Sequence, residues 1–394
     1  MLEETLFSLD LPYRQPMAVK AFSFGVDENG RLLGGSSKKA DAPNRAVSRG
    51  NADVFDDDAA IESSSKDSNA HADSQAAVPG EEPESQPADP AGFEKSACFV
   101  AGLRGNELQQ TFICSQLVRR LQSIERDGGL VPRKRITVVP CVNPASMNTG
   151  QRFWLSDGTD VNRMMPGYDL GETTQRIAGA LFEAVRGYEC GVHFSSYHLD
   201  GDFMDHVRVM SGPGNQDNHG SDFGLPYVLQ HVPGSFDTTT LHYNWRLWDT
   251  EAYTIYTRHT SVVDQAVAAN ATRACLRFLN ERGMVDYPGH RGFRATQFAE
   301  RQLAPAQSPC GGIFLPQAGL GDIVHHGQHI ADVVDPLTGE VRARIFAPRG
   351  GVVFYVCRAP LVNEQTLVFQ IIPRDVSMEG ETETARGNFL DPEA

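Results

Sequence analysis

Residues 98–107, Cys-Phe-Val-Ala-Gly-Leu-Arg-Gly-Asn-Glu, carry the strongest structural signal in this chain. They begin with a short apolar run, which is typical of a buried strand, and continue into a turn that contains glycine and charged groups. The residues that follow place Leu108, Phe112, Leu117, Val118 and Leu121 on one side of a helix. A buried strand, a polar turn and an amphipathic helix in this order are the repeating unit of an α/β protein.

The same unit repeats along the next part of the chain. Residues 136–140 predict another strand, and residues 177–185 place apolar side chains at the spacing of an amphipathic helix. Further strands are predicted at 191–195 and 253–257, and a long helix is predicted over 262–281. We therefore expect an α/β fold with a mixed central sheet and helices on both of its faces.

After Gly283 the pattern changes to short β-type runs that are separated by Gly, Pro and Asp turns. This spacing is typical of a small all-β domain, and residues 321–330 and 347–353 resemble a lipoyl or biotinyl-type barrel sandwich. Because the hairpin turn of such a domain carries no lysine here, we expect no swinging-arm cofactor.

A segment of very different composition interrupts the α/β pattern. Residues 36–96 are dominated by Ser, Ala, Asp, Glu and Pro, so they cannot bury enough apolar area to offset their ordering entropy. The expected organisation is N-terminal strands of the α/β domain (1–35), a disordered acidic insert (36–96), an α/β catalytic-type domain (97–285), a small β domain (286–376) and a flexible tail (377–394).

The composition also limits the classes of function. A formal net charge of −15 and the lack of a basic stripe with interleaved aromatic residues argue against nucleic acid as a partner. No apolar run approaches the ~18 residues of a membrane span, and the first residues lack the features of a secretory signal, so we expect a cytoplasmic protein. The seven cysteines form no Cys-x-x-Cys pair, which predicts free thiols. The sequence leaves self-association into a homo-oligomer open.

Polar residues follow four of the predicted strands, at 102–107, 143–167, 191–193 and 254–256. In an open α/β sheet, ligands bind beyond the carboxyl ends of the strands, so we expect these groups to form one site. The second group holds Arg152 and Arg163, and guanidinium groups suit carboxylates because each can donate two parallel hydrogen bonds. The sequence therefore predicts a small anionic substrate, or an oxyanion that forms during the reaction.

Taken in this order and at this spacing, the motifs resemble those of the succinylglutamate desuccinylase/aspartoacylase family, which has a zinc-carboxypeptidase-like scaffold. The resemblance covers nearly all of residues 98–372 and implies zinc as a cofactor. The implied roles fall on Glu107 and His193 as zinc ligands, on Arg152 as the group that polarises the scissile carbonyl, and on Asn162 with Arg163 as the pair that grips a substrate carboxylate. Zinc in such a site lowers the pKa of a bound water toward neutrality.

Three residues depart from the family pattern. Arg104 stands at the place of the first histidine ligand, and an always-charged guanidinium cannot bind a metal. Tyr256 stands at the place of the general-base glutamate, and Gly191 replaces an aspartate two positions before His193. The loss of a ligand and of the base together is typical of a hydrolase that no longer works.

The sequence is compatible with three functions. The leading one is a zinc-dependent hydrolase, with altered metal ligation, of amide bonds in small acidic N-acyl amino acids or short peptides. The alternative is a metal-free pseudoenzyme or anion-binding protein that keeps the arginine pocket and has lost hydrolysis. The third is a different reaction in which Arg104 and Tyr256 are the catalytic groups.

Two local alternatives concern the metal. In the first, Arg104 forms an ion pair with Glu107, so that the guanidinium takes the place where zinc would sit. In the second, Glu107 and His193 share a metal with residues of the following loop, namely His198, Asp202, Asp205 and His206.

Overall fold

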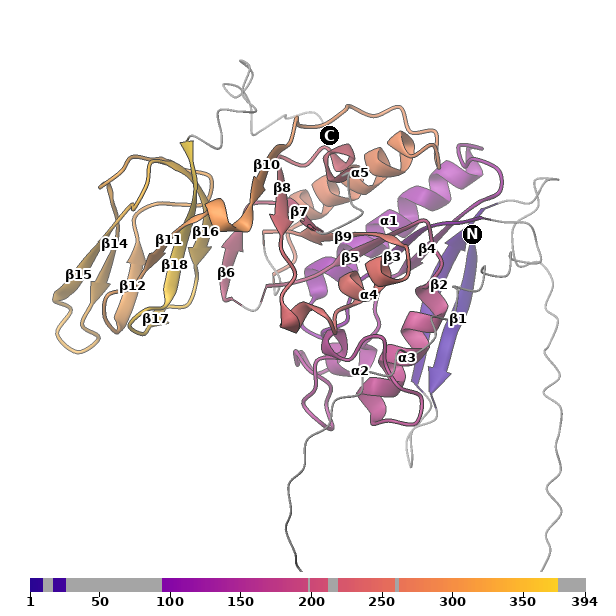
Figure 1. The fold of residues 1–394 in the computed structure, drawn as a ribbon, viewed down its shortest axis with the longest axis horizontal. Helices are drawn as coiled ribbons and strands as arrows, with labels where there is room; N and C mark the ends of the chain where they lie inside the picture. The colour runs from indigo at the N-terminus through magenta and orange to yellow at the C-terminus, as the bar shows by residue number, and fades with distance from the viewer. Residues whose placement is uncertain (10–16, 26–93, 198, 212–218, 259–261, 375–394) are drawn as a thin grey trace, which may run out of the picture. The chain divides into compact units, whose positions relative to one another are not determined.

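The computed structural model describes residues 1–9, 17–25, 94–197, 199–211, 219–258 and 262–374. Its central feature is a sheet with the strand order β1-β2-β4-β3-β5-β9-β7-β8-β10 (Figure 1). The strands are Leu2–Leu9 (β1), Met17–Phe24 (β2), Glu94–Val100 (β3), Lys134–Val139 (β4), Cys190–Phe194 (β5), His206–Met210 (β7), Tyr227–His231 (β8), Glu251–Tyr256 (β9) and Thr296–Ala299 (β10). Strands β4, β3, β5 and β9 are parallel, whereas β9 pairs with β7 in the antiparallel sense. The predicted α/β fold with a mixed sheet is confirmed.

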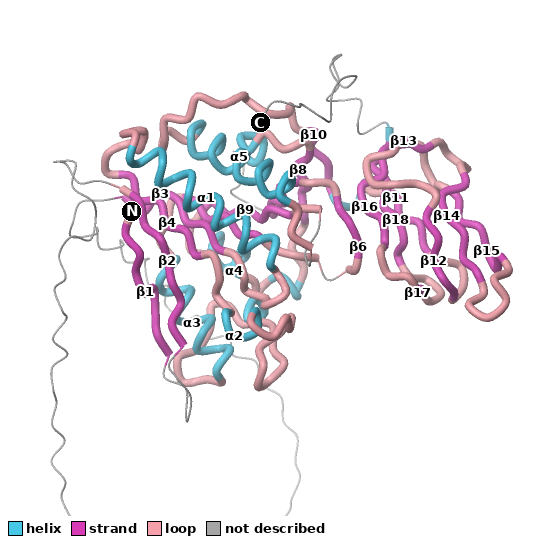
Figure 2. The backbone as a smooth tube through the Cα atoms, turned by 180° about the vertical axis from the view of Figure 1, so that it is seen from behind, coloured by secondary structure: helices cyan, strands magenta, loops and turns pink. Residues whose placement is uncertain are grey.

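Helices lie on both faces of this sheet, as Figure 2 shows from behind. They are Leu108–Arg126 (α1), Pro144–Met147 (α2), Thr173–Val185 (α3), Leu241–Leu247 (α4) and Gln265–Glu281 (α5). On strand β3, Phe99 packs in one apolar cluster with α1 and α5, while Cys98 and Val100 pack in another with α3 and α4. Successive strand residues point to opposite faces, so each pair of helices covers one face.

The ends of the helices follow from capping side chains. The helix predicted over 262–281 begins at Gln265, because the carboxylate of Asp264 accepts hydrogen bonds from the backbone N–H groups of Ala266 and Val267. Short 3-10 helices occur at Val161–Arg163 (η1), His219–Phe223 (η2), Ser235–Asp237 (η3) and Glu300–Gln302 (η4). Within the described ranges, no helix has the length and the apolar composition that crossing a membrane requires.

Beyond residue 303 the described chain consists of strands. They are Ala304–Gln307 (β11), Gly312–Pro316 (β12), Ile323–Val324 (β13), His329–Val334 (β14), Val341–Phe346 (β15), Gly351–Cys357 (β16), Leu361–Val362 (β17) and Leu367–Pro373 (β18). One sheet has the order β11-β18-β16-β13 and the other β15-β14-β12-β17, and neither is closed over the described residues. The predicted β structure is present, but the barrel-sandwich form is not confirmed.

One strand of the C-terminal sheet that contains β16 comes from the α/β region. Strand β6 (Gly201–Phe203), which lies between β5 and β7 in the sequence, pairs with β16 in the antiparallel sense. Directly after β16, Nε of Arg358 donates a hydrogen bond of 2.6 Å to the carboxylate of Asp202 on β6. The loop after β5 is therefore joined to the C-terminal sheet.

Parts of the predicted organisation fall on residues that the structure does not describe. Strand β3 begins at Glu94, inside the segment 36–96 that was predicted to be disordered, because polar residues at its start hide the strand pattern. The rest of that segment before residue 94 and the tail 377–394 lie outside the described residues. All seven cysteines are described and free, as predicted.

Candidate functional site

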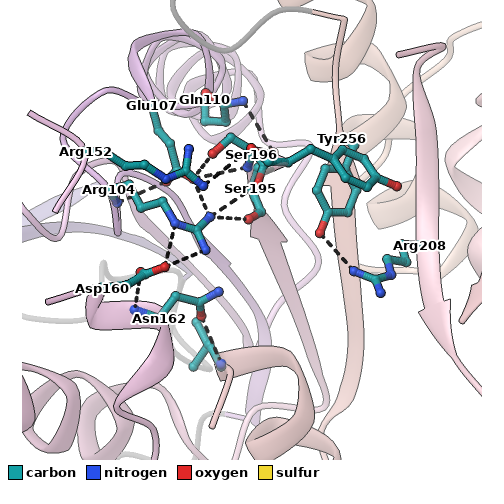
Figure 3. A network of polar contacts seen from close by, with 12 residues as sticks. Arg104, Glu107, Gln110, Arg152, Asp160, Asn162, Ser195, Ser196, Arg208 and Tyr256 are labelled. Carbon is teal, nitrogen blue, oxygen red and sulfur yellow. Dashed lines mark hydrogen bonds and ion pairs between the residues drawn. The ribbon is translucent and has the colours of Figure 1, made fainter. Parts of the chain in front are cut away.

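The candidate site lies where the parallel strands β3, β5 and β9 end. Arg104 and Glu107 occupy the turn between β3 and α1, and Ser195 and Ser196 follow β5. Asp160 precedes η1, and its carboxylate caps that helix by accepting from the backbone N–H of Asn162. Figure 3 shows these side chains pointing toward one another. Segments far apart in the sequence thus meet at the edge of the sheet that the motifs indicated.

Arg104 is the centre of this cluster. Its Nε lies 2.9 Å from Oδ2 of Asp160, and its Nη1 lies 3.1 Å from Oε1 of Glu107 and 3.1 Å from Oγ of Ser195. The side chain is only 6% exposed. Burial by itself would lower the pKa of Arg104, but the carboxylates of Glu107 and Asp160 outweigh it and raise the pKa. The guanidinium is therefore a permanent cation held between two carboxylates.

The carboxylate of Glu107 is largely occupied by hydrogen-bond donors of the protein itself. Its Oε1 accepts from Nη1 of Arg104 at 3.1 Å, from N of Ser196 at 3.1 Å and from Oγ of Ser196 at 2.8 Å. Its Oε2 accepts from the backbone N of Arg104 at 3.2 Å. A carboxylate offers about two lone-pair positions on each oxygen, so Oε1 is fully occupied by its three donors, while Oε2 has one donor. The first local alternative, an ion pair of Arg104 with Glu107, is the arrangement found.

His193 lies at the same edge, on β5, and is buried. Burial, with a smaller contribution from Arg104, lowers its pKa to about 3, so the imidazole is neutral. No described residue is a hydrogen-bond partner of its Nε2. Among the described residues, no group of three His, Cys, Asp or Glu side chains could hold a metal ion. The residues present therefore do not fit zinc held by Glu107 and His193.

The second local alternative for a metal also fails in its described members, because each of them has another partner. Asp202 is bound by Arg358, and Asp205 accepts a hydrogen bond from the backbone N of Arg258 at 2.9 Å. Nδ1 of His206 lies 2.7 Å from the carbonyl oxygen of Met204, and its Nε2 lies 3.1 Å from the hydroxyl of Tyr197. His198 lies outside the described residues.

Arg152 joins the site as a cation that no described carboxylate neutralises by direct contact. Its Nη2 lies 3.4 Å from the carbonyl oxygen of Tyr197, and its guanidinium lies 5.6 Å from the ring centre of Phe153. Burial and the repulsion from Arg104 lower its pKa. A half-buried guanidinium with weak partners is suited to an anion supplied by a ligand.

Asn162 and Arg163, the predicted carboxylate pair, are largely occupied by the protein itself. Oδ1 of the buried Asn162 accepts a hydrogen bond of 3.1 Å from the backbone N of Leu241, at the start of α4. Arg163 is exposed and donates to the carbonyl oxygen of Phe236. Asn162 therefore also holds the N-terminus of α4 in place.

Tyr256 is the last residue of β9. It contacts Arg208, a residue that the sequence motifs did not indicate. Its hydroxyl accepts a hydrogen bond of 3.3 Å from Nη1 of Arg208, on β7 (Figure 3). Its ring centre lies 4.2 Å from that of Tyr197 and 5.2 Å from that of His206. The only sequence signal for Arg208 was a charged residue inside an otherwise apolar strand.

The packing of α4 explains why position 191 is occupied by a glycine. A Cβ atom at Gly191 would lie 2.6 Å from Cε3 of Trp245, which is closer than real Cβ contacts come. Trp245 is held in place by a hydrogen bond of 2.9 Å from its Nε1 to the carbonyl oxygen of Val185. The space beside the sheet that an aspartate would need is therefore filled by an indole.

The fold and the site define an open α/β protein whose candidate ligand site lies at the carboxyl ends of its parallel strands. Residues 94–282 match the family model described as the succinylglutamate desuccinylase/aspartoacylase catalytic domain. This match assigns the domain at residues 94–282 to the succinylglutamate desuccinylase/aspartoacylase family, which is a family of hydrolases. No curated protein matches the chain in sequence.

Solved structures share the fold at low sequence identity. A succinylglutamate desuccinylase from a Silicibacter species is 18% identical, with a TM-score of 0.61, over 71% of this chain and 85% of that one. A putative family protein from Shewanella amazonensis is 12% identical, with a TM-score of 0.63, over 95% of this chain and 98% of that one. A product-bound ectoine utilization protein from Ruegeria pomeroyi is 18% identical, with a TM-score of 0.58, over 71% and 86%. These likenesses establish the fold.

Proposed function

We propose that this protein binds a small anionic compound of the N-acyl amino acid class without a metal, and that it has lost the hydrolysis of its family. The single observation that carries this proposal is the guanidinium of Arg104, which lies 3.1 Å from Oε1 of Glu107. A fixed positive charge at this distance from the carboxylate repels a divalent cation. The guanidinium also occupies Oε1 of Glu107, an oxygen that such a cation would need as a ligand.

The class of ligand follows from charge and from family membership. Arg104 is matched by Glu107 and Asp160, so Arg152 is the cation that remains for a ligand carboxylate or acyl oxygen. Family relatives are hydrolases of acylated amino acids, which carry both groups. The neutral phenol of Tyr256 donates or accepts a hydrogen bond and is a poor replacement for a general-base carboxylate.

Zinc-dependent hydrolysis with altered ligation is the second candidate, and one observation favours it. Nε2 of His193 has no partner among the described residues, so this nitrogen remains available. This candidate requires that Arg104 leave Glu107, which breaks a contact between a 6% exposed guanidinium and a side chain with no exposure. Because separating such a buried pair is costly, we rank this candidate below metal-free binding.

The experiment combines metal analysis with ligand binding on the full chain. We expect less than a tenth of a zinc per chain after purification with zinc present, and saturable binding of N-succinyl-glutamate or N-acetyl-aspartate by calorimetry with no product formed. Arg152→Met should abolish the binding, whereas Arg120→Met, an exposed arginine on α1, should leave it unchanged. About one zinc per chain together with turnover would establish the hydrolase instead.

Two further expectations from the sequence belong to this proposal. We propose that the C-terminal strands take a barrel-sandwich form and that the protein acts in the cytoplasm on a small anionic partner. Cell fractionation and an experimental structure of the full chain test both points directly.

A further inference from the structure

A row of polar side chains crosses the sheet beneath α4. His193 of β5 lies directly opposite Thr254 of β9, and Thr254 lies directly opposite Arg208 of β7. Residues paired in this way project to the same face of a sheet. Helix α4 covers this face, because Nδ1 of His242 lies 2.6 Å from Oγ1 of Thr254. The four side chains therefore form one cluster, which we call the Thr254 cluster.

Three nitrogen atoms of the Thr254 cluster are buried without a partner. They are Nε2 of His193, Nε2 of His242 and Nε of Arg208, none of which bonds to any residue in the described part of the chain. His193 is 1% exposed, His242 is 3% exposed and Thr254 is 4% exposed. Native proteins satisfy nearly all buried polar groups, so three orphaned atoms around one hydroxyl indicate a missing partner.

The charge around the cluster decides what kind of partner it takes. The Thr254 cluster contains one permanent cation, the guanidinium of Arg208, and no carboxylate, since Glu300 lies outside it with its Oε2 4.0 Å from Nη2 of Arg208. Such a field disfavours a metal cation and favours an anion.

We infer that the Thr254 cluster is a second binding site, which receives a small oxyanion between the sheet and α4. When the hydroxyl of Thr254 donates to Nδ1 of His242, the Nε2–H of that ring is free to donate to the anion. The Nε2–H of His193 and the Nε–H of Arg208 supply two more donors. The inference is independent of the proposed function, because Arg152, on which that function depends, does not belong to the cluster.

Thermal unfolding of the full chain tests the inference. Sodium phosphate and sodium acetate, each compared with sodium chloride at equal ionic strength, distinguish a phosphate from a carboxylate partner. We expect one of them to raise the melting temperature in a saturable way, because a ligand that binds only the folded state stabilises it. His242→Phe should weaken this apparent affinity about tenfold or more, since it removes a hydrogen bond to a charged group.

Controls separate this site from general effects. His219→Gln, which alters a histidine of η2 that is paired with Asp222, should keep the full anion-dependent rise. Arg152→Met should also keep it while losing the N-acyl compound, so failure of either proposal is visible alone. If His242→Phe does not fold, His242→Gln and a crystal grown with the anion replace it. No rise beyond sodium chloride, an equal rise in the variant, or water alone in the density would overturn the inference.

Discussion

The backbone N–H of Arg104 and its guanidinium both bind the carboxylate of Glu107, at 3.2 Å and 3.1 Å. One residue thus holds each oxygen of the same buried carboxylate. Through these two contacts Arg104 stabilises the buried carboxylate of Glu107 and holds the turn between β3 and α1 in place.

Arg104→Met should destabilise the protein by about 3–5 kcal/mol, because it leaves the buried Glu107 without a counter-charge. Urea unfolding measures the loss. The double variant Arg104→Met with Glu107→Gln should recover part of it, since the charge of Glu107 is then gone while Asp160, which is also paired with Arg104, keeps its charge. Equal losses in the single and double variants would show that the ion pair itself contributes little.

Gly191→Ala should cost about 1–3 kcal/mol, because the new methyl group overlaps the indole of Trp245 and forces the packing of α4 to shift. In a Trp245→Leu background the same change should cost much less, since the ring is gone. Chemical denaturation of the four proteins gives the coupling. Additive losses would mean that the indole does not restrict position 191.

Asn162→Asp separates the two tasks of this residue. Asn162→Ala should lose about 1 kcal/mol with the hydrogen bond to the backbone N of Leu241, whereas Asp keeps the acceptor oxygen but adds a charge at a buried position. The added negative charge should also weaken binding of a carboxylate ligand. Unchanged ligand affinity in Asn162→Asp would remove Asn162 from the ligand site.

Stability should fall as the pH decreases from about 6.5 to about 4. Burial lowers the pKa of His206 to about 4, so between these values the unfolded chain binds a proton that the folded protein does not. This stability is fully present above the unfolded pKa and is lost toward the folded one. His206→Gln should reduce the slope of unfolding free energy against pH by about 1.4 kcal/mol per unit. An unchanged slope would mean that His206 is protonated in the fold.

The sequence predicted the sheet and its helices because local apolar spacing is enough to define buried strands and amphipathic helices. It also placed Arg104, Glu107 and His193 at one edge, since parallel strands end on the same side. The ion pair between Arg104 and Glu107 was foreseen as an alternative because a buried carboxylate needs a positive partner.

What the sequence did not predict depends on contacts between distant segments. Asp160 lies 56 positions from Arg104, and local spacing gave no reason to pair them. Arg208 and His242 join His193 only through the register of β5, β9 and β7 and through the position of α4. The hydrogen-bond partners of Glu107 and His206, on which any metal ligation by these residues depends, likewise cannot be read from their neighbours in the sequence.

The pairing of β6 with β16 has a consequence for experiments on shortened forms of the protein. Ser195 and Ser196, which bind Arg104 and Glu107, stand at the beginning of the loop whose far end enters β6. A protein cut after residue 303 would leave the main chain of 201–203 and the carboxylate of Asp202 without their partners. Ligand affinity measured on such a fragment would therefore describe a site that has lost contacts present in the full chain.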